Sequence, residues 1–154
     1  MTEAGAVNEP DANMSASRRL YEEVFGKGNL DAADEIMAAH AVSHGPGSPP
    51  MTGTDQIKQQ ALRLRGSIPD LAVTLNDQFA SGDRVCNRWT GSGTFSVEMP
   101  MPSGVVAATG KAISFDEIRI DRYAGGKIVE SWFIPDRMTL FTAMGMVMAQ
   151  RASS

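Results

Sequence analysis

Two charged side chains that could act together in acid–base chemistry stand two residues apart, in the run Ile118-Arg119-Ile120-Asp121. Residues i and i+2 of an extended strand point to the same face, so Arg119 and Asp121 are expected to face the same way, opposite Ile118 and Ile120. An arginine can stabilise an enolate or phenolate oxygen, and a neighbouring carboxylate can orient it or accept a proton. A solvated ion pair on an exposed sheet face explains the same pattern equally well.

His44 is a third candidate for proton transfer, because an imidazole titrates near neutral pH. It stands in the segment HAVSHGPGSPPMTG, whose Gly and Pro residues predict a loop. His40 precedes it by four residues, but no third or fourth ligand accompanies the two histidines, so no metal site is expected. A hydrogen-bonded structural histidine is the other interpretation.

Long strands are expected to position Arg119 and Asp121. Residues 109–136 read as two strands joined by a turn at Gly125-Gly126. Alternating apolar residues predict two earlier strands, from Leu71 to Phe79 and from Arg84 to Phe95. The period of two in all four segments predicts a sheet with one buried face.

The strand that carries Arg119 changes phase within its sequence. Ile113 and Phe115 alternate in one phase, and Ile118 and Ile120 alternate in the other. One extra residue near Asp116-Glu117 would explain the change, which predicts a β-bulge at that point. A bulge bends its strand, so the sheet is expected to be strongly curved and to enclose a cavity.

Helical periodicity precedes and follows the strands. The expected helices begin at Ser15, at Asn29 or Asp31, at Thr54 or Asp55, and after Asp136, which can serve as an N-cap. The fold class predicted is α+β, with N-terminal helices packed on a strongly curved antiparallel β-sheet.

The chain of 154 residues is long enough for one domain with a hydrophobic core. We expect a disordered leader over residues 1–14 and a single domain over residues 15–150. The net charge is −4, and the 14 Lys and Arg residues are scattered, so nucleic acid is not an expected partner. Neither a bilayer-spanning apolar stretch nor a signal-peptide layout is present, so a cytoplasmic protein without a membrane partner is expected.

Apolar and small side chains on the predicted strands form a second group of candidates. The ten methionines suit a pocket for a flat polycyclic ligand, although they could equally fill gaps in the core. The residues expected to bind substrate are Trp89, Phe95, Met99, Met101, Phe115, Ser131, Trp132 and Phe133.

Several short motifs, taken in order, match a known family. They are YEEVFGKGNLDAADEIMAAHAVSH, Gly53-Thr54-Asp55, Pro69-Asp70-Leu71, RWTGSGT from Arg88, TGK from Thr109 and GKIVESW from Gly126. Together they resemble the SnoaL-like polyketide cyclase family over nearly all of Ser17 to Gly145. The resemblance implies a cone fold similar to nuclear transport factor two, a deep apolar cavity, homo-oligomers, and no metal or organic cofactor.

The resemblance transfers the fold more readily than the reaction. The Asp that acts as acid and base in the family's ring-closing cyclases corresponds here to Phe133, and the cyclase His corresponds to Arg119. The cyclase Asn falls near His44. Epoxide hydrolases with the same cone need an Asp-Arg-Asp set whose last carboxylate also falls at Phe133.

The resemblance therefore implies a cofactor-free tailoring enzyme of aromatic, anthracycline-type polyketide antibiotic biosynthesis. Its expected substrate is a polycyclic phenolic polyketide, with Arg119 stabilising an oxyanion and Asp121 or His44 moving a proton. Because the cyclase Asp is missing, ring hydroxylation, which could involve a reductase partner, is placed ahead of aldol ring closure. A non-catalytic binding module with the same cone is the other hypothesis.

Overall fold

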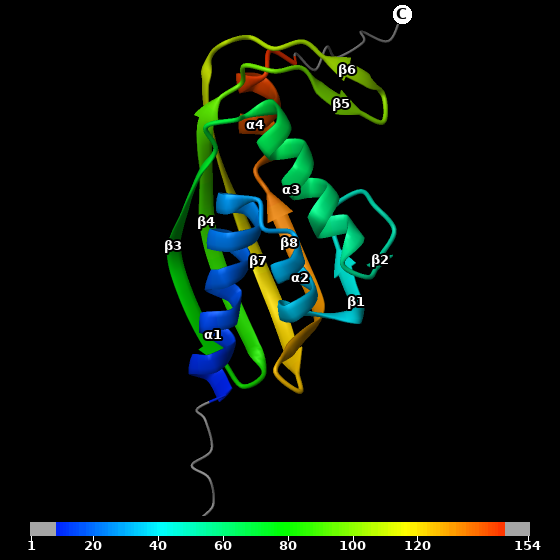
Figure 1. Cartoon of the computed structure of the whole chain (residues 1–154), viewed down its shortest axis with the longest axis vertical. Coiled ribbons are helices and arrows are strands. Elements are labelled where there is room, and N and C mark those ends of the chain that lie inside the picture. The colour runs from blue at the N-terminus through cyan, green and yellow to red at the C-terminus, as the bar shows by residue number, and fades with distance from the viewer. Residues whose placement is uncertain (1–8, 147–154) are drawn as a thin grey trace, which may run out of the picture.

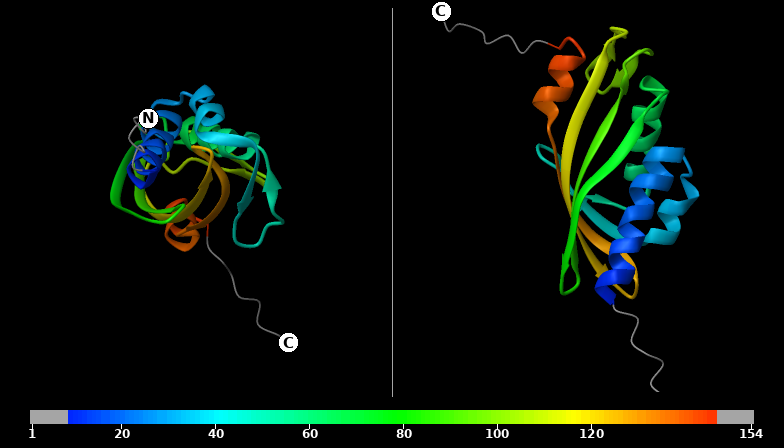
Figure 2. Two further views of the ribbon diagram at one scale, coloured as in Figure 1. Left: turned by 90° about the horizontal axis from the view of Figure 1, so that it is seen from below. Right: turned by 90° about the vertical axis from the view of Figure 1, so that its left-hand side faces the viewer.

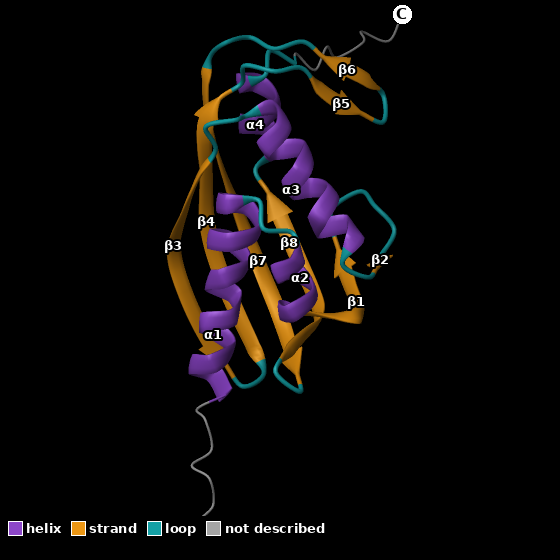
Figure 3. Ribbon diagram, viewed as in Figure 1, coloured by secondary structure: helices purple, strands orange, loops and turns teal. Residues whose placement is uncertain are grey.

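Helices from the first half of the chain cover one face of a six-stranded sheet in the computed structural model, which describes residues 9–146 (Figure 1). The helices are α1 (Glu9–Arg19), the π-helix η1 (Leu20–Phe25), α2 (Asp31–Ile36), α3 (Asp55–Ser67) and α4 (Arg137–Ala143). The strands are β1 (Met37–His44), β2 (Met51–Thr52), β3 (Ala72–Ser81), β4 (Arg84–Thr94), β5 (Met99–Met101), β6 (Gly104–Val106), β7 (Ala112–Ala124) and β8 (Lys127–Pro135). Figure 3 separates the two classes and shows α1, α2 and α3 on the same side of the sheet. The predicted α+β class is confirmed.

The sheet is mixed, whereas an antiparallel sheet was expected. Its strand order is β2-β1-β8-β7-β4-β3, and β5 and β6 form a separate hairpin. Every pairing in the six-stranded sheet is antiparallel except that of β1 with β8, which is parallel and places Ser43 beside Ser131. The segment from His40 to His44, predicted as loop, therefore belongs to β1. Its short side chains give a weak strand signal, and only the pairing with β8, far along the chain, reveals the strand.

The first helix begins at Glu9, six residues before the expected start at Ser15. Residues 9–14, which were assigned to the leader, are helical because the sheet supports them. Asn13 is buried, and the carbonyl of Met14 accepts a hydrogen bond of 2.8 Å from Gln78 on β3. The remaining leader residues, 1–8, and the predicted domain end at residue 150 lie outside the described residues.

The long hairpin β7–β8 has the predicted turn but not the predicted bulge. Gly125 and Gly126 both have positive φ, 60° and 80°, as a tight hairpin turn requires. Burial alternates without interruption along β7, and its register with β4 is continuous. The bulge prediction was wrong because Ile118, assumed to be buried, is 48% exposed.

The phase of β7 therefore places polar side chains inside. Glu117, Arg119 and Asp121 point to the same face as the apolar Ile113 and Phe115, beneath the helices. Register shifts occur elsewhere, between Leu75 and Asp77 of β3 and between Arg122 and Tyr123 of β7. Figure 2 shows that the sheet is strongly twisted and curved, as expected.

Aromatic side chains form the centre of the core beneath α1 and η1. Trp89 of β4 lies 5.4 Å from the ring of Tyr21 and 5.3 Å from that of Phe25, both on η1. Phe115 meets Trp89 edge to face at 5.7 Å. Within residues 9–146, no helix has both the length and the apolar character needed to cross a bilayer.

Candidate functional site

A cavity of about 580 Å³ opens between α3, the β5–β6 hairpin, the sheet and α4. Six of its lining residues form an apolar wall: Met99, Met101, Phe115, Phe133, Leu140 and Phe141. Four of these, Met99, Met101, Phe115 and Phe133, were predicted from the sequence to bind substrate. The facing helix α3 contributes amides, and β7 contributes one carboxylate, so the cavity has an apolar side and a polar side.

Glu117 is the only Asp or Glu among the described residues that lines this cavity. The side chain is 2% exposed, and its Oε1 accepts a hydrogen bond of 3.1 Å from the indole N–H of Trp89. Its Oε2 has only a long contact of 3.5 Å with the amide nitrogen of Gln60. Oε2 therefore keeps lone-pair capacity for a substrate proton.

Burial raises the pKa of Glu117 above its ordinary value, and the positive charge of Arg119 only partly opposes this effect. A carboxyl group with a raised pKa can exchange protons near neutral pH. In its protonated form it also leaves Arg119 and Asp121 as a neutral buried pair. Glu117 is therefore the group at this site best suited to acid–base chemistry.

Arg119 and Asp121 form a buried ion pair rather than a solvated one. Arg119 Nε donates to Asp121 Oδ1 at 2.8 Å, and the two side chains are 1% and 0% exposed. Ser131 Oγ donates to the same oxygen at 2.6 Å, and Asn87 Nδ2 contacts Asp121 Oδ2 at 3.4 Å. Burial opposes the charge on Arg119, but Asp121, Tyr21 and Glu117 together outweigh burial, so the pKa of Arg119 is raised.

Phe133 separates this ion pair from the cavity. Its ring lines the cavity, and the centroid lies 5.8 Å from the Cζ of Arg119, which does not line it. Phe133 is the register partner of Arg119. Gly45 provides the space for this arrangement, because a Cβ at that position would overlap the ring.

Several polar atoms near the ion pair lack partners. Both terminal nitrogens of Arg119 are buried without a hydrogen-bond partner among the described residues, as are Tyr21 Oη and Ser43 Oγ. An unsatisfied buried donor costs free energy, so this inner region suits ordered water or a ligand oxygen.

His44 and Trp132 lie on the opposite face of the sheet. Their rings stack at 5.4 Å, and Arg84 lies over the indole at 5.1 Å. His44 Nε2 is 2.8 Å from Glu130 Oε2, and this hydrogen bond lowers the pKa of Glu130. The structure does not bring His44 to Arg119 and Asp121.

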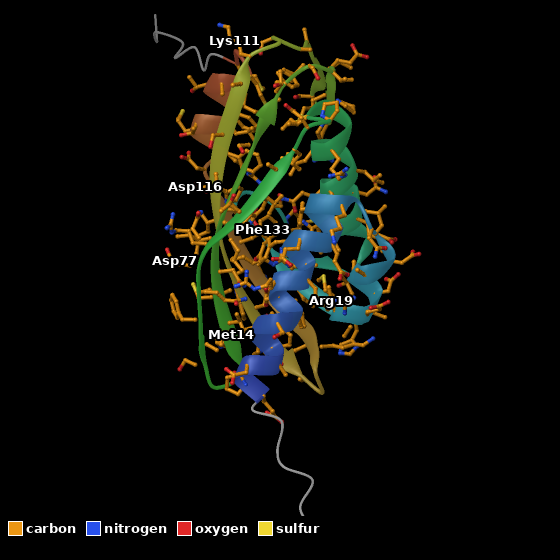
Figure 4. The ribbon with its side chains drawn as sticks, turned by 60° about the vertical axis from the view of Figure 1, so that its left-hand side comes forward. Met14, Arg19, Asp77, Lys111, Asp116 and Phe133 are labelled. Atoms are coloured by element: carbon orange, nitrogen blue, oxygen red, sulfur yellow. The ribbon has the colours of Figure 1, made fainter. Side chains whose placement is uncertain are left out.

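Like Trp132, three more residues predicted to bind substrate do not line the cavity: Trp89, Phe95 and Ser131. Trp89 holds Glu117, Ser131 holds Asp121, and Phe95 is fully buried in the core. Figure 4 shows Phe133 between the sheet and the helices, whereas Asp116 lies at the outer side of the sheet. Within residues 9–146, no three His, Cys, Asp or Glu side chains come together as a metal site would require.

Glu117 was missed in the sequence prediction because the bulge was placed at that residue. Glu117 stands two residues before Arg119, as Arg119 stands two residues before Asp121. Continuing the alternation of buried residues from Phe115 without a bulge would therefore have placed Glu117 on the inner face. Tyr21 was not among the residues predicted for the site. Its contact with Trp89 depends on the packing of η1 against β4.

Comparisons with known proteins agree with this architecture. A family model described as SnoaL-like polyketide cyclase matches residues 15–144. A proposed SnoaL-like polyketide cyclase from Jannaschia sp. CCS1 is similar in structure, with a TM-score of 0.78 and 20% identity over 92% of this chain and 96% of that one. AclR from Streptomyces galilaeus, a proposed hydroxylase, has a TM-score of 0.76 and 18% identity over 92% of this chain and 89% of that one.

A third solved structure is more similar in sequence. IdmH from Streptomyces antibioticus, a proposed polyketide cyclase, has a TM-score of 0.70 and 29% identity, covering 86% of this chain and 98% of that one. No curated protein matches the chain by sequence. The Jannaschia protein and AclR, each below 25% sequence identity, show only that the fold is shared.

Proposed function

This chain belongs to the SnoaL-like polyketide cyclase family, and we propose that it catalyses aldol ring closure in an enolisable, phenolic polycyclic polyketide. Glu117 takes and returns the proton in this reaction. The observation that carries the proposal is a buried carboxyl group with a raised pKa, the only carboxyl in the described residues that lines the cavity.

The geometry supports Glu117 as a substitute for the cyclase Asp that is missing at position 133. Trp89 fixes Oε1, and Oε2 removes a proton from a carbon next to a substrate carbonyl. The carbanion carbon of the resulting enolate attacks a second carbonyl of the same molecule, forming a carbon–carbon bond and leaving an alkoxide. Glu117 then returns its proton to the alkoxide, so the product has the mass of the substrate.

The ion pair beneath Phe133 acts on this chemistry from a distance. Arg119 bears a positive charge, which favours the negative charge that develops on the enolate. Asp121 orients Arg119 and prevents its Nε from turning toward the cavity. Arg119 is therefore proposed as a positioning and electrostatic residue.

Ring hydroxylation is the second candidate, supported by the aromatic side chain at Phe133 in place of the cyclase carboxylate. In that reaction Glu117 removes a phenolic proton and the electron-rich ring reacts with dioxygen. One oxygen atom enters the ring and the other leaves as water, which consumes two electrons from a reductase partner or an added reductant. Cyclisation is placed ahead because Glu117 supplies the missing base, and an aldol reaction needs no reductant.

Mass spectrometry of the products separates these candidates. The protein is incubated in air with an open-ring polycyclic polyketide ester, with and without a reductant. A product of unchanged mass with a new ring supports cyclisation, and a gain of one oxygen supports hydroxylation. No protein-dependent product would contradict both and favour the binding module.

Two variants connect the product to the site. Glu117→Gln keeps the shape and the acceptor for Trp89 but cannot transfer the proton, and it should lower turnover by about 100-fold or more. Asp116→Asn is the matched control, because Asp116 is the next residue on β7 but is exposed on the outer face. Equal activity of Glu117→Gln and Asp116→Asn would refute the proposal.

A further inference from the structure

Helix α3 presents a row of polar side chains to the cavity. Gln56, Gln59, Gln60 and Arg63 recur at intervals of three and four residues and line it together, while Ile57 and Ala61 face the core. Gln56 and Gln60 are half-buried, whereas Gln59 and Arg63 are exposed. The first two therefore face the interior of the cavity, and the other two lie at its rim.

Gln56 and Gln60 each carry an unused acceptor. The Oε1 atom of each is buried and has no hydrogen-bond partner among the described residues. A buried amide oxygen without a partner is unfavourable, so these two amides favour an occupant, water or ligand, that donates hydrogen bonds. The two residues are four apart on a helix, so their amides repeat at about 6 Å along the cavity.

The opposite wall limits the shape of the occupant. It consists of Met99, Met101, Phe115 and other apolar side chains, which suit the face of a flat ring system. Gln60 also contacts Glu117, so a ligand group bound to Gln60 lies beside the carboxyl. A flat ligand with hydroxyl groups along one edge fits the two amide oxygens, the apolar wall and the position of Glu117.

We infer that Gln56 and Gln60 form a specificity site for the hydroxylated long edge of a fused-ring substrate. This inference rests on the proposed function and specifies its substrate: two hydroxyl groups on the same edge donate to the two amide oxygens. The contact with Gln60 fixes which ring lies beside Glu117. The amide row therefore selects the position at which the proton is removed.

The test compares two isomeric dihydroxyanthracenes, which have no carbonyl beside the hydroxyls, by equilibrium dialysis. One has both hydroxyls on the same long edge, and the other has them on opposite edges, so the two are identical in composition. The wild type should bind the same-edge isomer about fivefold more tightly, which corresponds to one additional hydrogen bond. Equal affinities for the two isomers would overturn the inference.

The preference should depend on the amide row. Gln56→Leu should abolish the difference between the isomers. Leu62→Ala is the matched control, because Leu62 is an exposed residue of α3 that does not line the cavity, and it should keep the wild-type preference. A Gln56→Leu protein that discriminates like the wild type would refute the site, and Gln60→Leu provides the second variant should Gln56→Leu fail to fold.

Dialysis measures binding without turnover, so it tests the specificity site independently of the proposed function. If Glu117→Gln retains activity while the isomer preference persists, the proposed function is wrong and the specificity site stands. If turnover depends on Glu117 but the isomers bind equally, only the specificity site is wrong.

Discussion

Replacing Asp121 by Leu should destabilise the fold strongly while nearly preserving the shape of the side chain. Asp121 is fully buried, and Arg119, Ser131 and Asn87 all hydrogen-bond to it or contact it. Leucine keeps the branch at Cγ but removes the charge and both acceptors. Arg119 then remains charged, because a guanidinium does not lose its proton in proteins, and at 1% exposure its charge is buried without a partner.

The magnitude follows from leaving one charge of a buried pair without its partner, which costs about 3–5 kcal/mol. That is a large share of the roughly 5–15 kcal/mol that stabilises a typical domain. For a chain of this size the melting temperature should fall by about 6–20 °C.

A double-mutant cycle tests whether the pair is the cause. Asp121→Leu, Arg119→Met and the double variant are unfolded in urea at one protein concentration, with tryptophan fluorescence as the signal. The double variant should be more stable than Asp121→Leu, because it buries no unpaired charge. A loss below about 1 kcal/mol in Asp121→Leu, or additive losses in the double variant, would refute this reasoning.

Three further predictions concern the site and its surroundings. Burial raises the pKa of Glu117, so the contribution of this side chain to stability falls as the pH rises through that pKa. In urea unfolding, Glu117→Gln should therefore be more stable than wild type at about pH 8 and no more stable at about pH 4. A gain in stability that does not depend on pH would contradict burial as the cause. Gly45→Ala should push the ring of Phe133 aside and lower the free energy of unfolding by about 1–3 kcal/mol in thermal unfolding. In Gly66→Ala the new methyl group meets no neighbour, so no stability should be lost. Equal effects of the two variants would argue against the close packing of Phe133. His44→Ala should change turnover by less than about twofold because the imidazole lies on the outer face, and a loss above about tenfold in kcat would return it to the reaction.

The sequence was sufficient for features that depend on local patterns. The Gly125-Gly126 turn, the α3 start at Asp55 and the Asp136 cap follow from residue types with strong local preferences, and Thr139 N–H donates to Asp136 at 3.0 Å as a cap requires. The pairing of Phe133 with Arg119 depends on the register of the β7–β8 hairpin, which the turn residues alone do not fix to within one residue.

The sequence-based prediction was wrong where polar side chains are buried and apolar ones are exposed. Hydrophobic alternation assumes that apolar residues face inward, but β7 buries Glu117 and Arg119 and exposes Ile118. Trp89 and Asp121, from two different strands, support that inversion by hydrogen-bonding to Glu117 Oε1 and Arg119 Nε. Such contacts are set by the tertiary fold, so no local pattern could place the carboxyl in the cavity.

The parallel pairing of β1 and β8 shows the same limit. Ser43 and Ser131 become neighbours although 88 positions separate them, since 131 − 43 = 88. This pairing turns His44 to the outer face together with Trp132. Reading the segment as a loop left the direction of His44 open and so kept it among the catalytic candidates.

The most direct test of the central claim measures proton removal alone. Anthrone is a flat, enolisable tricyclic ketone, and its exchange of carbon-bound hydrogen in deuterated water can be followed by mass spectrometry. The wild type and Asp116→Asn should accelerate exchange about 100-fold or more over Glu117→Gln, with a rate that rises through a pKa above 4.5. Exchange by Glu117→Gln at the wild-type rate would show that Glu117 does not move the proton.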